Sequence, residues 1–200
     1  MFPRFYPIVP DVSWAARLAP TGIKVLQLRM KDVSGPEISS AIRRALDLCR
    51  AAGCELIVND YWQEAIDCGA SFVHLGQTDL ETADVSALKR AAIKIGLSTH
   101  SHEELDRALS EDPDYVALGP IYETKLKAMP WAPQGLDRIG EWKALAKRTL
   151  VAIGGITLER APLVFSAGAD SIAVVTDIVA HARPEERARD WLAAFPDEVD

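Results

Sequence analysis

Short apolar runs recur along the whole chain, and they constrain its fold more than any other feature. Each run is rich in Val, Ile and Leu without strict alternation, and turn residues and a segment with helical spacing follow it. Such runs are typical of parallel strands that are covered on both faces. Eight of them are present, at residues 6–9, 25–28, 56–58, 72–75, 93–97, 115–118, 150–153 and 172–175.

The segments between the runs predict helices. A helix is expected over 37–52, where Gly53 provides a stop, and another over 102–109, where Ser101 is the N-cap and Glu104 completes a capping box. A short amphipathic segment also follows the third run. The same spacing predicts helices over 136–145, 158–167 and 184–194, and more weakly over 81–90.

Eight strand–helix units joined by right-handed crossovers close most simply into an α/β barrel, the (β/α)8 TIM barrel. The chain has 200 residues, of which 48% are hydrophobic, and no linker divides it. We therefore expect a single domain over 1–200. An open doubly wound sheet is the alternative, but no GxGxxG fingerprint follows the first run.

Charge and composition exclude several classes of partner. The net charge of −7 gives no overall basic field for nucleic acid or an anionic membrane, and no window approaches a membrane span. The three cysteines are odd in number and lack a CxxC spacing, which disfavours a disulfide framework or a zinc site. These features predict a cytoplasmic protein. Whether it is a homo-oligomer stays open, because a sequence does not separate exposed helical faces from interfaces.

Two acidic residues follow neighbouring strands of the predicted barrel. Asp60 follows the third run after Asn59, and Asp79 comes shortly after the fourth run. The carboxyl ends of parallel strands share one rim, so these carboxylates can share a hard cation such as Mg²⁺. The alternative is structural: Asp60 caps the next helix and Asp79 lies in a turn.

Basic residues are expected on the same rim. Alternation places Gln27, Arg29 and Lys31 on a common side of the second strand, and Lys127 lies in the long loop after the sixth. Beside two carboxylates, these cations suggest a metal-bridged diphosphate. The alternative is that they are ordinary solvated cations.

A glycine pair follows the seventh strand, and exposed backbone is expected after the eighth. Gly154 and Gly155 precede a predicted helix, which is the usual phosphate-binding arrangement of such barrels. The alternative is that the pair only permits a tight turn. Two phosphate sites would mean two phosphorylated small-molecule ligands, or one long one.

Seven ordered motifs, each at a predicted strand end, resemble the thiamine phosphate synthase family over nearly the whole chain. They are QLRMKD at 27–32, VND at 58–60, VHLGQTD at 73–79, GLSTH at 96–100, DYVALGPIYET at 114–124, IGGIT at 153–157 and AGAD…VVTDI at 167–178. Any one of these motifs alone would be weak evidence, but seven in order are specific.

The resemblance implies an activity and a role for each matching residue. Hydroxymethylpyrimidine diphosphate and hydroxyethylthiazole phosphate would condense to thiamine phosphate and diphosphate, and Asp60 and Asp79 would bind Mg²⁺. The implied pyrimidine diphosphate contacts are Gln27, Arg29, Lys31, Asn59, Ser98 and Lys127, of which Arg29, Lys31, Ser98 and Lys127 would be catalytic. The implied thiazole phosphate contacts are Thr124, Gly155, Val175 and Thr176.

The chain departs from the family pattern at a few positions. Leu126 replaces a hydroxyl residue that commonly precedes the lysine matched to Lys127, and the doublet Tyr61-Trp62 stands where polar residues are usual. The spacing also leaves open whether Lys125 or Lys127 faces the diphosphate. Two rival functions stay open. One is the thiazole tautomerase branch of the same fold, which has a catalytic histidine where this chain has Pro120. The other is a non-catalytic barrel that binds a thiamine precursor.

Overall fold

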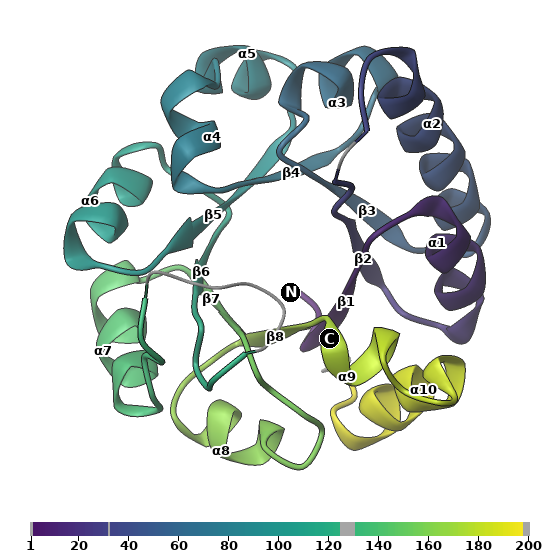
Figure 1. Cartoon of the computed structure of the whole chain (residues 1–200). Coiled ribbons are helices and arrows are strands. Elements are labelled where there is room, and N and C mark those ends of the chain that lie inside the picture. The colour runs from purple at the N-terminus through teal and green to yellow at the C-terminus, as the bar shows by residue number, and fades with distance from the viewer. Residues whose placement is uncertain (1, 32, 125–130, 198–200) are drawn as a thin grey trace.

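The computed structural model describes residues 2–31, 33–124 and 131–197. Within these residues, eight parallel strands form a closed barrel in chain order, and the eighth strand pairs with the first. Helices surround the barrel on its outside (Figure 1). The predicted (β/α)8 TIM barrel is therefore confirmed.

The strands lie where the apolar runs predicted them, with small shifts at their ends. One shift matters for the site: the apolar run at 93–97 predicted a fifth strand that ends before Ser98 and Thr99, but both residues lie within β5. The strands are β1 (Phe5–Val9), β2 (Val25–Leu28), β3 (Glu55–Asn59), β4 (Phe72–Leu75), β5 (Lys94–Thr99), β6 (Tyr115–Leu118), β7 (Thr149–Ile153) and β8 (Ser171–Val174).

The outer layer contains the predicted helices and further short ones. The α-helices are α1 (Val12–Leu18), α2 (Pro36–Ala51), α3 (Trp62–Cys68), α4 (Gln77–Thr82), α5 (Val85–Arg90), α6 (His102–Ser110), α7 (Asp137–Ala146), α8 (Ala161–Ser166), α9 (Thr176–Val179) and α10 (Pro184–Ala194). A 3-10 turn, η1 (Ala19–Thr21), follows α1. None of the helices among the described residues has the length and apolar character needed to span a membrane.

Three helix predictions needed correction. The single helix expected over 81–90 is two helices, because the Asp84 side chain caps α5 by accepting a hydrogen bond from Ala87 N at 2.8 Å. Helix α8 begins at Ala161, three residues later than expected. The capping box of α6 is half formed: Ser101 accepts from Glu104 N, but the Glu104 carboxylate accepts from His100 N rather than from Ser101 N.

Alternation along the strands separates two apolar cores. One fills the barrel interior and includes Tyr6, Val25, Ile57, Phe72 and Tyr115. The other lies between the strands and the surrounding helices. Because successive strand side chains point to opposite faces, every second residue after an interior one also faces the barrel axis. The interior therefore continues upward into the polar residues that stand at the mouth.

Helix α10 covers the seam where β8 meets β1. The Trp191 ring stacks on Phe5 with centroids 4.9 Å apart, and its Nε1 donates to Asp177 at 2.8 Å. Arg187 donates to both carboxylate oxygens of Asp177, at 2.9 and 3.0 Å. These contacts tie α10 to the start of α9, just beyond the carboxyl end of β8.

Candidate active site at the mouth of the barrel

Asp60 stands at the end of β3 in an unusual conformation. Its φ is 67°, in the left-handed region that few non-glycine residues adopt, and its backbone N donates to His74 O at 2.9 Å. The N-cap position of α3 is Tyr61, and no side-chain hydrogen bond caps that helix. The structural alternative for Asp60, a capping role, is therefore wrong.

Asp79 lies in the first turn of α4, close to Asp60. A Cβ atom added to Gly76 would lie 3.0 Å from Asp79 Oδ2, so the carboxylate folds back over a residue without a side chain. Burial and then the neighbouring Asp79 carboxylate together raise the pKa of Asp60 to about 6, although the charge of Arg29 opposes the rise. The fold thus holds two carboxylates together although they repel each other.

This pair suits one kind of cation. No group of three or more His, Cys, Asp and Glu side chains that could hold a metal occurs in the described part of the chain. Mg²⁺ is commonly bound by one or two carboxylates, and water and substrate phosphate oxygens complete its octahedron. Two partly buried carboxylates on a rim open to solvent fit that donor set, whereas a zinc site would need more protein ligands.

The cations predicted on the rim differ in burial. Arg29 is half-buried, and its backbone N donates to Val9 O at 2.8 Å, which extends the β1–β2 ladder. Its guanidinium charge acts to lower the pKa of Asp60. Lys31 is exposed. Lys127, Lys125 and Leu126 lie outside the described residues.

Polar side chains line the barrel interior below the rim. Asn59 and His74 are buried, and the Nε2 atom of Gln27 is buried with no hydrogen-bond partner among the described residues. Gln77 donates from Nε2 to Ser98 O at 2.6 Å, while its buried Oε1 is likewise unpartnered within that part of the chain. Unpaired buried amide atoms cost free energy. They are suited to a polar ligand that supplies the missing partners.

Four of the side chains at the rim and in the interior had no site role in the sequence interpretation: Tyr6, His74, Gln77 and Tyr115. The two tyrosines lie in the apolar interior, and their hydroxyl groups join a hydrogen-bonded chain through His74 to Ser98. Alternation alone places Tyr115 inside the barrel. Its contact with Tyr6, 109 positions away in the sequence, depends on the closure and stagger of the barrel.

The loop after β6 and the turn after β7 lie against each other. Ile121 N donates to Ile153 O at 2.9 Å and Tyr122 N donates to Gly154 O at 3.0 Å, which continues the sheet ladder past the strands. Gly155 has a φ of 65°, and a Cβ there would lie 2.5 Å from Glu123 O. A glycine is therefore required at position 155 both for the turn and for this close approach.

The remaining predicted phosphate contacts lie in the same region of the rim. Thr124 is half-buried in the loop after β6, Val175 is the N-cap residue of α9, and Thr176 is the first residue of that helix. The structure therefore places Thr124, Gly155, Val175 and Thr176 at the carboxyl ends of β6, β7 and β8. That position matches the usual phosphate site of the fold.

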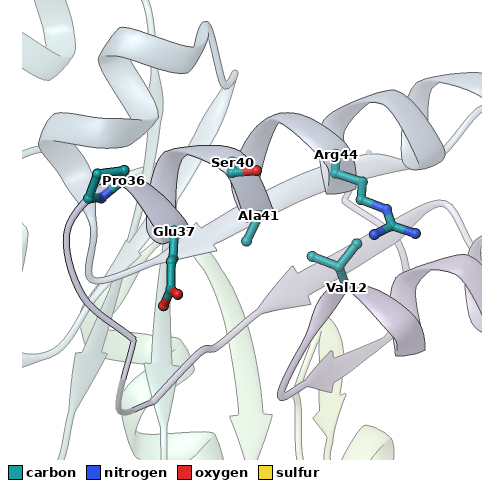
Figure 2. Close-up of a pocket in the computed structure, with 6 residues that line it drawn as sticks. All are labelled: Val12, Pro36, Glu37, Ser40, Ala41 and Arg44. Atoms are coloured by element: carbon teal, nitrogen blue, oxygen red, sulfur yellow. The ribbon is translucent and has the colours of Figure 1, made fainter.

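Two concave surfaces lie outside the mouth. One is a groove on the outer wall between α1 and α2, where Val12 faces Ala41 and Arg44 across it (Figure 2). The other lies beside the ends of β5 and β6, where the Trp131 ring stacks on His100. Neither contains the Asp60–Asp79 pair.

A closed (β/α)8 barrel that presents paired carboxylates, an arginine and a glycine-lined turn on one rim defines a class: TIM-barrel enzymes that bind phosphorylated ligands there. The family model of thiamine monophosphate synthase matches residues 6–178. The chain belongs to that family.

Similar proteins agree with this assignment. The chain is 56% identical to the thiamine-phosphate synthase of Rhizobium etli over 191 residues, which cover 95% of this chain and 94% of the relative. It is 45% identical to the thiamine-phosphate synthase of Neisseria gonorrhoeae, over 96% of this chain and 94% of that one. The solved structure of thiamine phosphate pyrophosphorylase from Pyrococcus furiosus superimposes with a TM-score of 0.81 at 25% identity, covering 96% of this chain and 94% of that chain.

Proposed function

We propose that this protein is a transferase that joins hydroxymethylpyrimidine diphosphate to hydroxyethylthiazole phosphate, giving thiamine phosphate and diphosphate. Membership of the thiamine monophosphate synthase family supports the reaction. The observation that carries the mechanism is the juxtaposition of Asp60 and Asp79 beside Arg29, where burial and mutual repulsion raise the pKa of Asp60 to about 6. A divalent cation bound between the two carboxylates would offset their mutual repulsion.

In this proposal each side of the mouth holds one substrate. Asp60 and Asp79 hold Mg²⁺, and the pyrimidine diphosphate contacts are Gln27, Arg29, Lys31, Asn59, Ser98 and Lys127. The thiazole phosphate contacts are Thr124, Gly155, Val175 and Thr176. The orphan Nε2 of Gln27 supports the first assignment, and the packed β6 and β7 turns support the second.

The reaction needs little acid–base catalysis from the protein. The C–O bond between the pyrimidine methylene and the diphosphate breaks, and its electron pair leaves with the diphosphate. The thiazole nitrogen then donates its lone pair to the methylene carbon, so no proton changes hands. Mg²⁺, when bound, neutralises charge on the diphosphate. Arg29 and Lys31 would stabilise the same developing charge on the leaving group.

Excluding water from the reacting carbon is the second requirement. The apolar barrel interior below the mouth, built around Tyr6, Phe72 and Tyr115, supports this role because it leaves water few partners. No general base is needed, and His74 is suited to remain neutral. Burial and, to a smaller extent, the charge of Arg29 lower its pKa to about 4.

The setting of the protein is part of the proposal. We propose that residues 1–200 act as one catalytic domain in the cytoplasm. Cys49 and Cys54 are buried free thiols and Cys68 is a partly buried one, as expected where thiols stay reduced.

The testing experiment combines purified protein with both phosphorylated substrates, in Mg²⁺ and in EDTA, and follows thiamine phosphate and diphosphate together. We expect equal amounts of the two products, and only with the metal. Metal-independent isomerisation of the thiazole would instead indicate a tautomerase, although Pro120 stands where that branch has its histidine. Binding of either substrate without product would indicate a precursor-binding barrel.

A further inference from the structure

A chain of four polar side chains runs through the barrel interior from its apolar floor to its mouth. The Tyr6 and Tyr115 hydroxyls are 3.3 Å apart, and the Tyr115 hydroxyl lies 2.7 Å from His74 Nδ1. His74 Nε2 lies 2.8 Å from Ser98 Oγ. The four residues come from four different strands, β1, β6, β4 and β5. Only the barrel brings them together.

Burying this row of hydrogen-bonded side chains costs the fold stability. Tyr115 is 0% exposed, Tyr6 1% and His74 7%, whereas Ser98 is partly exposed at the mouth. A Cβ at Gly96 would overlap the Tyr115 ring, so the glycine leaves the space in which that ring crosses the interior. The ring also stacks on His74 at an interplanar angle of 18°. A glycine inside a strand weakens it, which makes this placement a specific requirement.

The hydrogen bonds between these four side chains run in one direction, because each hydroxyl carries one proton. Burial raises the pKa of both tyrosines, which therefore remain protonated donors. Around Tyr6 lie the Phe2 ring and the apolar interior core, and its polar partner among the described residues is Tyr115. Tyr6 must therefore donate to Tyr115, since a buried O–H without an acceptor is costly.

The remaining protons follow from the first. Tyr115 accepts from Tyr6, so its own proton goes to Nδ1 of His74. A neutral imidazole that accepts at Nδ1 carries its hydrogen on Nε2, and it donates that hydrogen to Ser98 Oγ. The Ser98 hydroxyl proton is then free to point into the mouth, because no described residue accepts it.

We propose that Tyr6, Tyr115 and His74 are positioning residues that fix the Ser98 hydroxyl as a hydrogen-bond donor toward an acceptor atom of the pyrimidine substrate. The identity of that substrate rests on the proposed function. Gln77 assists from the other side, because its donation to Ser98 O holds the backbone of the same residue. If the hydrogen bonds between the four side chains ran in the opposite direction, the Ser98 hydroxyl would be an acceptor. It would then favour an N–H group on the ligand.

The test is a double-mutant cycle between Tyr115→Phe and Ser98→Ala. Tyr115→Phe keeps the ring and removes the hydroxyl that sets the His74 tautomer. We expect each single variant to lower kcat/KM for the pyrimidine diphosphate about tenfold, the effect of about one hydrogen bond. The double variant should be no worse than Ser98→Ala, and the KM for the thiazole phosphate should not change.

A matched control lies one residue away on the outer face of β5. Thr99 is buried, donates to Ala117 O at 2.9 Å and accepts from Trp142 Nε1 at 2.8 Å. Thr99→Val therefore also removes a buried hydroxyl from this strand. We expect a lowered Tm with unchanged kcat/KM. Independent, multiplicative losses in the Tyr115 and Ser98 cycle, or an equal kinetic effect of Thr99→Val, would overturn the proposal.

A second measurement separates this proposal from the proposed function. The 15N and 1H chemical shifts of the His74 ring, measured without substrate or metal, report its tautomer directly. We expect the Nε2–H tautomer in the wild-type protein and a shift toward Nδ1–H in Tyr115→Phe. A wild-type Nδ1–H tautomer would refute the proposed direction of the hydrogen bonds from Tyr6 to Ser98, whatever product the enzyme makes. An Nε2–H tautomer in a protein that forms no thiamine phosphate would refute only the proposed reaction.

Discussion

Asp60 shows, at the scale of one residue, that the fold maintains an arrangement that is unfavourable in isolation. Its backbone adopts a φ of 67°, and its carboxyl is partly buried beside a second carboxylate. Asp and Asn tolerate the left-handed region better than most residues, so the backbone cost is modest. The electrostatic cost is larger. Costs of this kind are concentrated at functional sites, where a ligand relieves them.

Replacing Asp60 with Asn should therefore separate activity from stability. The amide removes the proposed metal ligand but keeps the left-handed backbone, so we expect turnover to fall about a thousandfold or more. Removing the carboxylate repulsion should raise the Tm of the metal-free protein by about 2–4 °C. Calorimetry and a product assay measure the two effects. The control is Asp67→Asn on the exposed face of α3, which changes the net charge equally and should alter neither.

The pH dependence of stability has a definite sign at the same residue. In the folded, metal-free protein the pKa of Asp60 is about 6, above its ordinary value of 3.8, so the folded state holds this proton more tightly than the unfolded state. The contribution of Asp60 to stability is therefore fully present below about pH 4 and is lost as the pH rises to about 6. The Tm advantage of Asp60→Asn should grow over that interval and then level off. A constant difference from pH 4 to pH 7 would contradict the raised pKa.

Elements, taken one at a time, were largely predictable from the sequence. Val, Ile and Leu runs identified all eight strands, and alternation placed Gln27 and Arg29 on one side of β2. Helix boundaries were less predictable, because short-range signals compete: Asp84 caps α5 and thereby splits the segment 81–90. The Tyr6–Tyr115 contact was not predictable, since the register and stagger of the closed barrel determine it. The left-handed φ of Asp60 likewise has no sequence signal distinct from an ordinary turn.

The turns after β6 and β7 should behave as one unit, and Gly155 tests this. Gly155→Ala forces a side chain against Glu123 O and the Tyr122 Cβ atom in addition to the left-handed strain. We expect a rise of about tenfold or more in the KM for the thiazole phosphate, because the displaced turns carry its predicted site. Steady-state kinetics with each substrate varied in turn measures the effect.

Gly53→Ala is the control for backbone strain alone. Gly53 has a similar φ of 68° at the end of α2, but nothing lies within 4 Å of an added Cβ. The substitution should cost about 1–2 kcal/mol of stability and leave both KM values unchanged. If the two alanine variants had the same kinetics, the packing of the two turns would not matter to the site.

The whole molecule depends on closure between its first and last strands. The family match ends at residue 178, yet α10, at Pro184–Ala194, lies beyond it and packs over the β8–β1 seam. Its Trp191 is fully buried against Phe5, and its Arg187 pairs with Asp177 at the start of α9. A barrel has no free edge, so what stabilises its seam stabilises the entire sheet. Helix α10 should thus belong to the cooperative unit of folding.

Trp191→Ala tests that dependence. The variant loses a buried ring, its stacking on Phe5 and a hydrogen bond to Asp177, so we expect it to lower the free energy of unfolding by about 3–5 kcal/mol. Leu192→Ala, at the neighbouring half-buried position, should cost clearly less, and urea denaturation measures both. Because Trp191 lies on the outer side of the seam, its variant should keep kcat/KM within about threefold below its Tm. A Trp191→Ala protein no less stable than Leu192→Ala would show that the strands alone close the barrel and that α10 is peripheral to it.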